Sequence, residues 1–431
     1  MDSATQDSME TIDAAVDQPE PVAVSGNRIA SLDFIRGIAV MGILAANIVA
    51  FGQPFQAYMY PGAFTTPHGE AENWMWVAQF VLIDGKMRGL FSLLFGAGLY
   101  LFMEKAWQRG ATRWLQVRRL LWLGLFGLVH FFLIWRGDIL FLYACAGLAA
   151  LLFVRLSPKR QMLLGVLGYI GGAVLYAAST IPLVALADAP AEDVPAGMAE
   201  VREGLNEGIE TQMADGRTEV ALHEGGSYPA IVAHMVRSHW SDLAVSLLLF
   251  AFETLPLMLM GMALYRLGLF DGGVARRRML IWGWAGLLVG GAGMLVIALM
   301  TKAGGLTYYG TLAAFVGWSA IPKLLMTLGL AALLSLWGAQ ASGWLAERVS
   351  AAGRAAFTNY IGTSVVMMLI FHGWASGLFG ALTRGQLYLV VVATWMLMLA
   401  WSKPWLARYR YGPLEWLWRC LTYGRRFQLR R

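Results

Sequence analysis

Ionisable and hydrogen-bonding side chains inside apolar stretches are the residues of this sequence best suited to chemistry. A charge near the centre of a membrane helix costs roughly 2.5–3.5 kcal/mol on insertion scales, so such residues are candidates for a functional site. The first apolar stretch carries Asp33 and Arg36 at i and i+3, which places both on one helical face. Asn47 lies about three turns further along the same stripe. We expect this polar seam to bind a ligand; alternatively, Arg36 reaches lipid phosphates and Asp33 caps the helix.

A histidine and an aspartate flank the turn between two later apolar stretches. His130 lies near the end of one stretch, and a tight turn at Arg136-Gly137 leads to Asp138 at the start of the next. At about 1.5 Å per residue, His130 should lie roughly 9 Å below that turn. A carboxylate that orients a histidine fixes its tautomer and stabilises the imidazolium ion, which is the usual general-base arrangement. We expect His130 to be a base oriented by Asp138, with a purely structural histidine as the alternative.

A carboxylate also occurs near the middle of a further apolar stretch. Glu253 precedes Pro256, which frees a backbone carbonyl nearby. A carboxylate at this depth suits the proton or ion site of a carrier. It equally suits an internal salt bridge to Lys86, Arg88 or Lys323.

The other reactive residue types show no familiar spacing. The two cysteines, Cys145 and Cys420, form neither a disulfide framework nor a metal motif. His223, His234 and His239 contain only a loose i, i+5 pair, so we interpret them as solvated or interfacial. The sequence has no nucleotide-binding loop and no serine nucleophile elbow. We therefore expect no metal and no permanently bound cofactor.

Membrane helices must position these residues, because the composition is incompatible with a soluble core. Of 431 residues, 58% are hydrophobic and 14% are charged, against about 25% charged in soluble domains, and the mean hydropathy is +0.56. Apolar stretches of roughly 17–25 residues recur, each long enough to cross about 30 Å of hydrocarbon. We predict an all-α, polytopic membrane bundle of about ten transmembrane helices. The predicted spans are 34–53, 87–103, 117–135, 138–154, 162–186, 241–265, 279–301, 321–338, 355–372 and 386–402, with 72–84 and 305–318 as interfacial helices or further spans.

The distribution of charge between loops predicts the topology. The net charge of +6 comes from Lys and Arg that alternate between connections, which argues against a nucleic-acid partner and for the positive-inside pattern of a membrane protein. Both termini are then cytoplasmic. The predicted organisation is an acidic disordered tail over 1–27, membrane helices over 28–186, an extracytoplasmic segment of loops or amphipathic helices over 187–240, membrane helices over 241–402 and a basic tail over 403–431.

Several motifs together resemble a known family. They are Ser31-Leu-Asp-Phe-Ile-Arg-Gly-Ile-Ala39, Phe91-Ser-Leu-Leu-Phe-Gly-Ala-Gly98, Gly137-Asp-Ile-Leu140 with Tyr143 and Gly147, Thr358-Asn-Tyr360, and Gly412-Pro-Leu-Glu-Trp-Leu-Trp-Arg419. This set resembles the YeiB-like family of bacterial membrane proteins, named domain of unknown function 418. The opening motif is also similar to the start of transmembrane acyltransferases, namely bacterial O-acyltransferases and the lysosomal heparan glucosaminide N-acetyltransferase.

The resemblance to acyltransferases implies acyl transfer from a cytoplasmic acyl-CoA to an acceptor on the far side. Asp33 and Arg36 would then organise the donor entrance, and Asn47 or Asn359 would hydrogen-bond the acyl oxyanion. The sequence departs from the bacterial O-acyltransferases at Asn47, where those enzymes carry a histidine. The base must then be His130.

The heparan enzyme has a histidine after its first span, which points to His68 as the second candidate base.

The leading hypothesis is an inner-membrane acyltransferase with acyl-CoA as cosubstrate and a small-molecule, lipid or carbohydrate acceptor. The main alternative is a transporter or exporter coupled at Glu253, and a non-catalytic membrane scaffold is the third.

Overall fold

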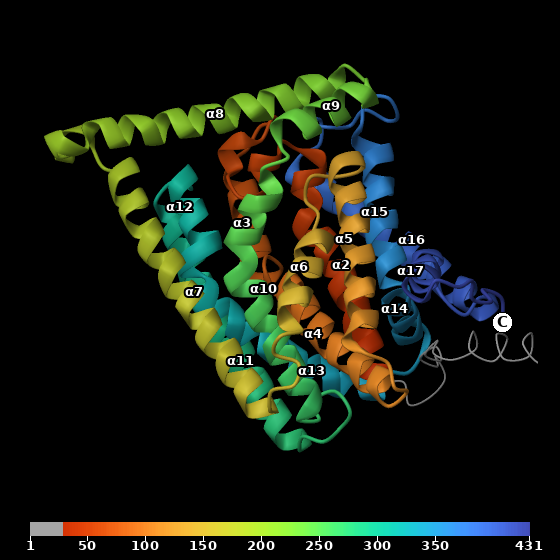
Figure 1. Cartoon of the computed structure of the whole chain (residues 1–431). Helices are drawn as coiled ribbons and strands as arrows, with labels where there is room; N and C mark the ends of the chain where they lie inside the picture. The colour runs from red at the N-terminus through yellow and green to blue at the C-terminus, as the bar shows by residue number, and fades with distance from the viewer. Residues whose placement is uncertain (1–28) are drawn as a thin grey trace, which may run out of the picture.

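A bundle of long helices forms the body of the protein, and two further helices lie across one end of it (Figure 1). The computed structural model describes residues 29–431, so the tail expected over 1–27 lies outside the described residues. Within the described part the regular elements are helices, apart from one isolated β-bridge between Tyr409 and Arg430. The helices are α2 (Ala30–Gly52), α3 (Glu70–Leu82), α4 (Lys86–Trp107), α5 (Arg113–Leu133), α6 (Leu140–Ala150), α7 (Pro158–Ala187), α8 (Ala199–Glu224), α9 (Tyr228–Ser238), α10 (Asp242–Arg266), α11 (Arg276–Ala303), α12 (Tyr308–Ala313), α13 (Ala320–Gln340), α14 (Trp344–Arg354), α15 (Ala356–Phe371), α16 (Arg384–Arg408) and α17 (Pro413–Tyr423).

The prediction of an all-α polytopic membrane bundle is confirmed. Eight helical stretches of the described chain are long and apolar enough to cross a membrane, and a ninth results if α14 and α15, which meet at 87°, count as one span. Each of the ten predicted spans coincides with a helix. The predicted span 138–154 is the short apolar helix α6, and 355–372 is α15 of that bent pair.

The two undecided apolar segments form short helices. Residues 72–84 lie largely in α3, which together with α4 makes one 38-residue apolar stretch, Glu70–Trp107. Residues 305–318 form α12 and a turn of π-helix, Ala314–Trp318. Neither segment forms an independent span.

Glycines allow the central helices to touch along their backbones. A Cβ atom added at Gly96 on α4 would overlap the carbonyl of Met258 on α10, and one at Gly261 on α10 would overlap the carbonyl of Leu93 on α4. Small residues are typical of such close crossings, because membrane helices gain little from burying apolar surface against each other. The backbone contact therefore fixes α4 against α10.

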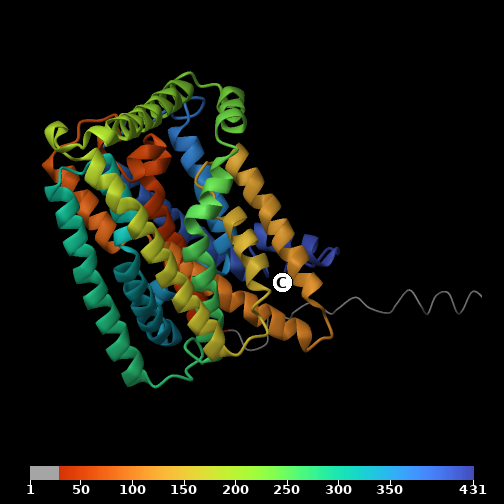
Figure 2. The same ribbon diagram turned by 60° about the vertical axis from the view of Figure 1, so that its left-hand side comes forward.

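The bundle has two chemically different ends. The connections 108–112, 155–157, 267–275 and 341–343, with the helix ends that flank them, carry many arginines, and we call this the basic end. The segment 187–240 forms α8 and α9, which lie across the opposite end in both views, and we call this the α8 end (Figure 2). Among the described residues, positive charge is thus denser at the basic end than at the α8 end.

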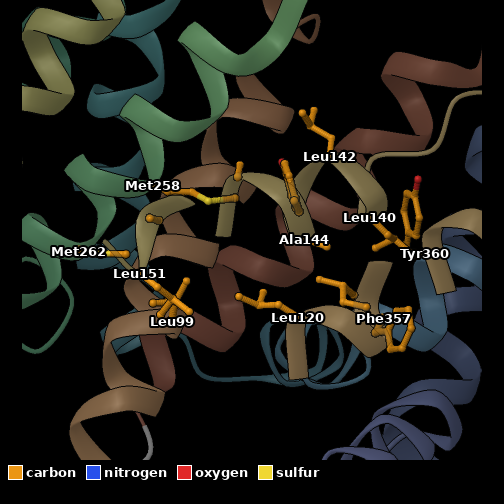
Figure 3. Close-up of a cluster of buried hydrophobic side chains, with 14 of the residues drawn as sticks. Leu99, Leu120, Leu140, Leu142, Ala144, Leu151, Met258, Met262, Phe357 and Tyr360 are labelled. Carbon is orange, nitrogen blue, oxygen red and sulfur yellow. The ribbon is translucent and has the colours of Figure 1, made fainter. Parts of the chain in front are cut away.

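A buried apolar cluster lies between the two ends. It joins α4, α5, α6, α10 and α15 through side chains that include Leu99, Leu120, Leu142, Met258 and Phe357 (Figure 3). Tyr360 of α15 lies at the edge of this cluster. The packing fixes α5, α6 and α15 relative to one another, and these three elements carry the candidate site.

Candidate functional site

His130 and Asp138 are in direct contact. His130 lies in the last turn of α5, and its carbonyl accepts hydrogen bonds from the amides of Ile134 and Trp135 at 2.9 and 2.8 Å, which end the helix. The chain then turns back, so that Nδ1 of His130 lies 2.8 Å from Oδ1 of Asp138. The hairpin expected from the sequence thus forms, and it closes the gap between the two side chains.

Asp138 has two separate partners, one for each carboxylate oxygen. Its Oδ2 accepts a hydrogen bond of 2.8 Å from the amide of Phe141 in the first turn of α6, as N-capping carboxylates do. Gly127 on α5 permits this approach, since a Cβ atom there would overlap the Phe141 amide nitrogen. Oδ1 remains for His130, so the capping bond also orients the catalytic candidate.

The third member of the group is Ser364 on α15. Its Oγ lies 2.9 Å from Nε2 of His130, on the opposite side of the ring from Asp138. A serine, a histidine and an aspartate joined in this order form the arrangement that activates a hydroxyl nucleophile. The sequence analysis did not identify Ser364. The polar pair Thr363-Ser364 inside an apolar helix was the available signal.

The three side chains are shielded from solvent. His130 is 0% exposed and Ser364 is 2% exposed, and the Asp138 side chain is 0% exposed. The rings of Tyr360 and Trp135 cover His130 at centroid distances of 5.1 and 6.2 Å. Exclusion of water strengthens every electrostatic interaction within the group.

Asn47 lies beside the same group. It lines a cavity of about 10 Å³ together with Ser364, Tyr360 and Trp135. A cavity of this size holds about one water molecule. Asn47, a candidate site residue from the sequence, therefore lines the same small cavity as Ser364.

A larger cavity lies on the other side of Tyr360 and reaches toward the basic end. Its volume is about 230 Å³. Most of its lining is apolar, and Arg36, Arg119 and Arg354 add three guanidinium groups. Asp33 lies outside this lining but forms an ion pair of 3.3 Å with Arg36. The polar seam predicted on the first span therefore borders this cavity at Arg36 and the smaller one at Asn47.

The side chain of Asn359, in contrast, forms hydrogen bonds between helices. Its amide nitrogen donates to the carbonyl of Ala352 at 3.0 Å and to Ser402 at 3.1 Å, and its amide oxygen accepts from Trp401 at 2.9 Å. These bonds join α15 to α14 and α16. The structure does not bring Asn359 to the histidine.

Glu253 forms the internal salt bridge that the sequence allowed. Its two carboxylate oxygens lie 2.9 Å from Arg88 and 2.8 Å from Lys323. Lys86, the third expected partner, donates instead to the carbonyl of Asp84 at 2.9 Å. Glu253 thus belongs to a separate charged group that links α4, α10 and α13.

His68, the second candidate base, lies away from the site. Its ring packs at 5.1 Å from that of Phe64 in the connection before α3. It shares neither of the two cavities described above. Among the candidate bases, only His130 has a carboxylate and a hydroxyl on its two ring nitrogens.

Comparisons with known proteins identify relatives along nearly the full length of the chain. The chain is 31% identical over 405 residues to "Uncharacterized protein YeiB" of Escherichia coli strain K12, covering 91% of this chain and 95% of the relative. It is 28% identical over 417 residues to "Uncharacterized protein YxaH" of Bacillus subtilis strain 168, covering 93% and 95%.

A third relative and a family model agree with these matches. The chain is 25% identical over 419 residues to an "Uncharacterized 39.9 kDa protein in amylase 3'region" of Bacillus acidopullulyticus, covering 95% of this chain and 98% of the relative. The model described as "Protein of unknown function (DUF418)" matches residues 264–425. No solved structure matches the chain. With the motifs and full-length matches taken together, the chain belongs to the YeiB-like, DUF418 family of bacterial membrane proteins.

Proposed function

We propose that this protein is a membrane acyltransferase that passes an acyl group from acyl-CoA, through Ser364, to a hydroxyl or amine acceptor. The observation that carries the proposal is the buried contact of His130 with both Asp138 and Ser364. Asp138 holds the proton of His130 on Nδ1, which leaves Nε2 free to accept the proton of Ser364.

The larger cavity suits the acyl donor. Arginines bind phosphate groups in a planar, bidentate way, and Arg36, Arg119 and Arg354 line the cavity with apolar residues beyond them. A volume of about 230 Å³ is below the roughly 300 Å³ of pockets that enclose a whole small molecule. The three arginines then bind the phosphates of the donor at the side of the cavity toward the basic end, and the acyl and thioester end occupies the apolar part.

Transfer proceeds in two balanced steps. In the first, the Ser364 hydroxyl attacks the thioester carbonyl, His130 takes the hydroxyl proton, and the carbon–sulfur bond breaks, so that the CoA thiolate leaves with the proton from His130. In the second, His130 takes a proton from the acceptor as the acceptor attacks the acyl-serine ester, the ester carbon–oxygen bond breaks, and the serine oxygen leaves with the proton from His130, which restores the Ser364 hydroxyl. Asn47 donates to the oxyanion in both steps, and movement of Tyr360, which lines both cavities, admits the thioester.

The topology accommodates this direction of transfer. Positive charge favours the cytoplasmic side, so the basic end faces the cytoplasm, where acyl-CoA is found, and both chain ends lie there. The protein is then an inner-membrane enzyme with an extracytoplasmic acceptor. A carrier coupled at Glu253 receives less support, because that carboxylate is already bonded to Arg88 and Lys323.

The test is release of free thiol from a series of acyl-CoAs by the purified protein, combined with intact-mass detection of an acyl adduct. Wild-type protein should release thiol and carry one acyl group on the peptide that contains Ser364. Ser364→Ala and His130→Gln should lose both signals. Ser335→Ala is the matched control, because Ser335 is a similarly buried helical serine whose side chain, among the described residues, bonds only the carbonyl of Ala331.

Two outcomes would refute the proposal. Wild-type protein that cleaves none of the acyl-CoAs has no acyltransferase activity toward them. A Ser364→Ala variant with normal transfer would remove the serine from the reaction.

A further inference from the structure

Three potential metal ligands converge at the α8 end, away from the proposed acyl-transfer group. Asp215 belongs to α8, His234 to α9, and His239 to the turn before α10. The Nε2 atoms of the two histidines lie 3.2 Å apart. Oδ1 of Asp215 lies 3.6 Å from Nε2 of His234 and 3.3 Å from Nε2 of His239. The three atoms thus form a nearly equilateral triangle.

The size of this triangle matches one face of a zinc coordination tetrahedron. Zinc binds histidine nitrogen and carboxylate oxygen at about 2.0–2.2 Å. Neighbouring ligands of a tetrahedral ion at that distance lie roughly 3.3–3.5 Å apart. An ion above the triangle would reach all three atoms without rearrangement of the backbone.

The remaining polar atom of each ligand is held by a partner that turns its coordinating atom inward. Nδ1 of His239 lies 3.2 Å from Asp242, and Nδ1 of His234 lies 3.3 Å from Ser238. Such partners on the second ring nitrogen are typical of metal-bound histidine, because they fix its orientation and tautomer. Support for the ligands is therefore already in place.

Asp215 is oriented in the same way. Its Oδ2 accepts hydrogen bonds of 3.0 Å from both Arg136 and Gln56, which leaves Oδ1 directed at the histidines. With both histidines neutral, two carboxylates and one guanidinium give the cluster a net negative charge that a divalent cation would reverse. The side chains of Asp215 and His234 are about one-fifth exposed, so an ion can enter from solvent.

We propose that Asp215, His234 and His239 bind a zinc ion at the α8 end. Three protein ligands leave a fourth position for water or an incoming group. The ion joins α8, α9 and the start of α10, and Arg136 connects it to the hairpin that carries Asp138. The zinc site and the proposed acyl transfer are tested by separate measurements, so either proposal can fail without the other.

The competing description is a metal-free network of hydrogen bonds. Burial lowers the pKa of His239, but its hydrogen bonds to Asp215 and Asp242 raise it to about 9 overall. A protonated His239 would then hold the two carboxylates without an ion. Direct measurement of bound metal separates the two descriptions.

The experiment measures zinc per chain by elemental analysis of full-length protein that has been stripped with chelator, incubated with zinc chloride and desalted. We expect about one zinc per wild-type chain and a melting temperature that rises with zinc concentration. His234→Gln should abolish both effects. His223→Gln should retain them, because His223 is a buried α8 histidine that bonds only the Glu219 carbonyl within the described chain.

A second measurement requires no variant. Cobalt(II) in place of zinc should give the intense visible absorption of a four-coordinate ion in the wild-type protein. Absence of stoichiometric zinc together with absence of this absorption would overturn the proposal in favour of the hydrogen-bonded network. Equal zinc content in wild type and His234→Gln would overturn it by placing the ion elsewhere.

Discussion

The two ring nitrogens of His130 have different partners, and this difference makes the role of Asp138 testable. Asp138→Asn keeps an oxygen to cap α6 but presents an amide N–H to Nδ1 of His130. The imidazole must then carry its proton on Nε2 and can no longer accept one from Ser364. We expect thioester cleavage to fall by about 10²- to 10⁴-fold with the fold retained, as measured by thiol release and thermal unfolding.

Asp138→Ala serves as the companion variant. It removes the cap as well as the orienting oxygen, so it should lose a further ~1 kcal/mol of stability. A normal cleavage rate in Asp138→Asn would contradict the assigned tautomer.

The raised pKa of the Glu219 carboxyl on α8 predicts that the stability of the protein depends on pH. Burial raises its pKa from the usual 4.5 to about 7, although Arg136 and the Phe55 amide act in the opposite direction. Between pH 4.5 and 7 the folded state holds a proton that the unfolded state has released, so this carboxyl makes stability fall as pH rises. Glu219→Gln removes the titration. Its melting temperature relative to wild type should therefore increase from pH 5 to pH 7.5, and a constant difference would contradict the shifted pKa.

Residue types and local spacing predicted part of the site. The neighbourhood of His130 and Asp138 was predictable because one short hairpin joins them. The contact with Ser364 was not, since it spans 234 positions along the chain and depends on how α15 packs against α5. The candidate Asn359 shows the opposite case. It belongs to a polar motif, but its side chain hydrogen-bonds neighbouring helices and does not reach the site.

Helix positions were more predictable than helix geometry. The predicted span 241–265 corresponds to α10 at Asp242–Arg266, and 34–53 to α2 at Ala30–Gly52, since hydropathy depends only on local sequence. The 87° bend between α14 and α15 was not foreseen. The helix breaks at Ala355, next to a close contact of α14 with α2, where a Cβ atom at Gly353 would overlap the carbonyl of Asp33.

The crossing of α4 and α10 supports a prediction about helix packing. Gly261→Ala should destabilise the protein by about 1–3 kcal/mol, because the added methyl group meets the backbone of Leu93 and the helices must separate. Gly171→Ala on α7 is the matched control, since no atom lies within 4 Å of its added Cβ. Thermal unfolding in detergent compares the two. Equal melting temperatures would show that the crossing tolerates separation.

For the molecule as a whole, the asymmetry of charge predicts its orientation. A cysteine replacing Glu210 on α8 should react with a membrane-impermeant maleimide in intact cells, whereas one replacing Asp271 at the basic end should react only after permeabilisation. The physical reason is the retention of Arg-rich connections in the cytoplasm. The reverse labelling pattern would place α8 and the proposed zinc cluster inside the cell and would remove the route for acyl transfer outward.

Arg136 has a consequence for how the two ends of the molecule communicate. Its guanidinium bonds Asp215 and Asp242 at the α8 end, and its backbone lies in the hairpin that leads to Asp138. We expect an ion at the proposed zinc site that shifts Arg136 to shift this hairpin as well. By thermodynamic reciprocity, a donor that shifts the same hairpin would change the affinity of the zinc cluster by the factor by which zinc changes the affinity for that donor.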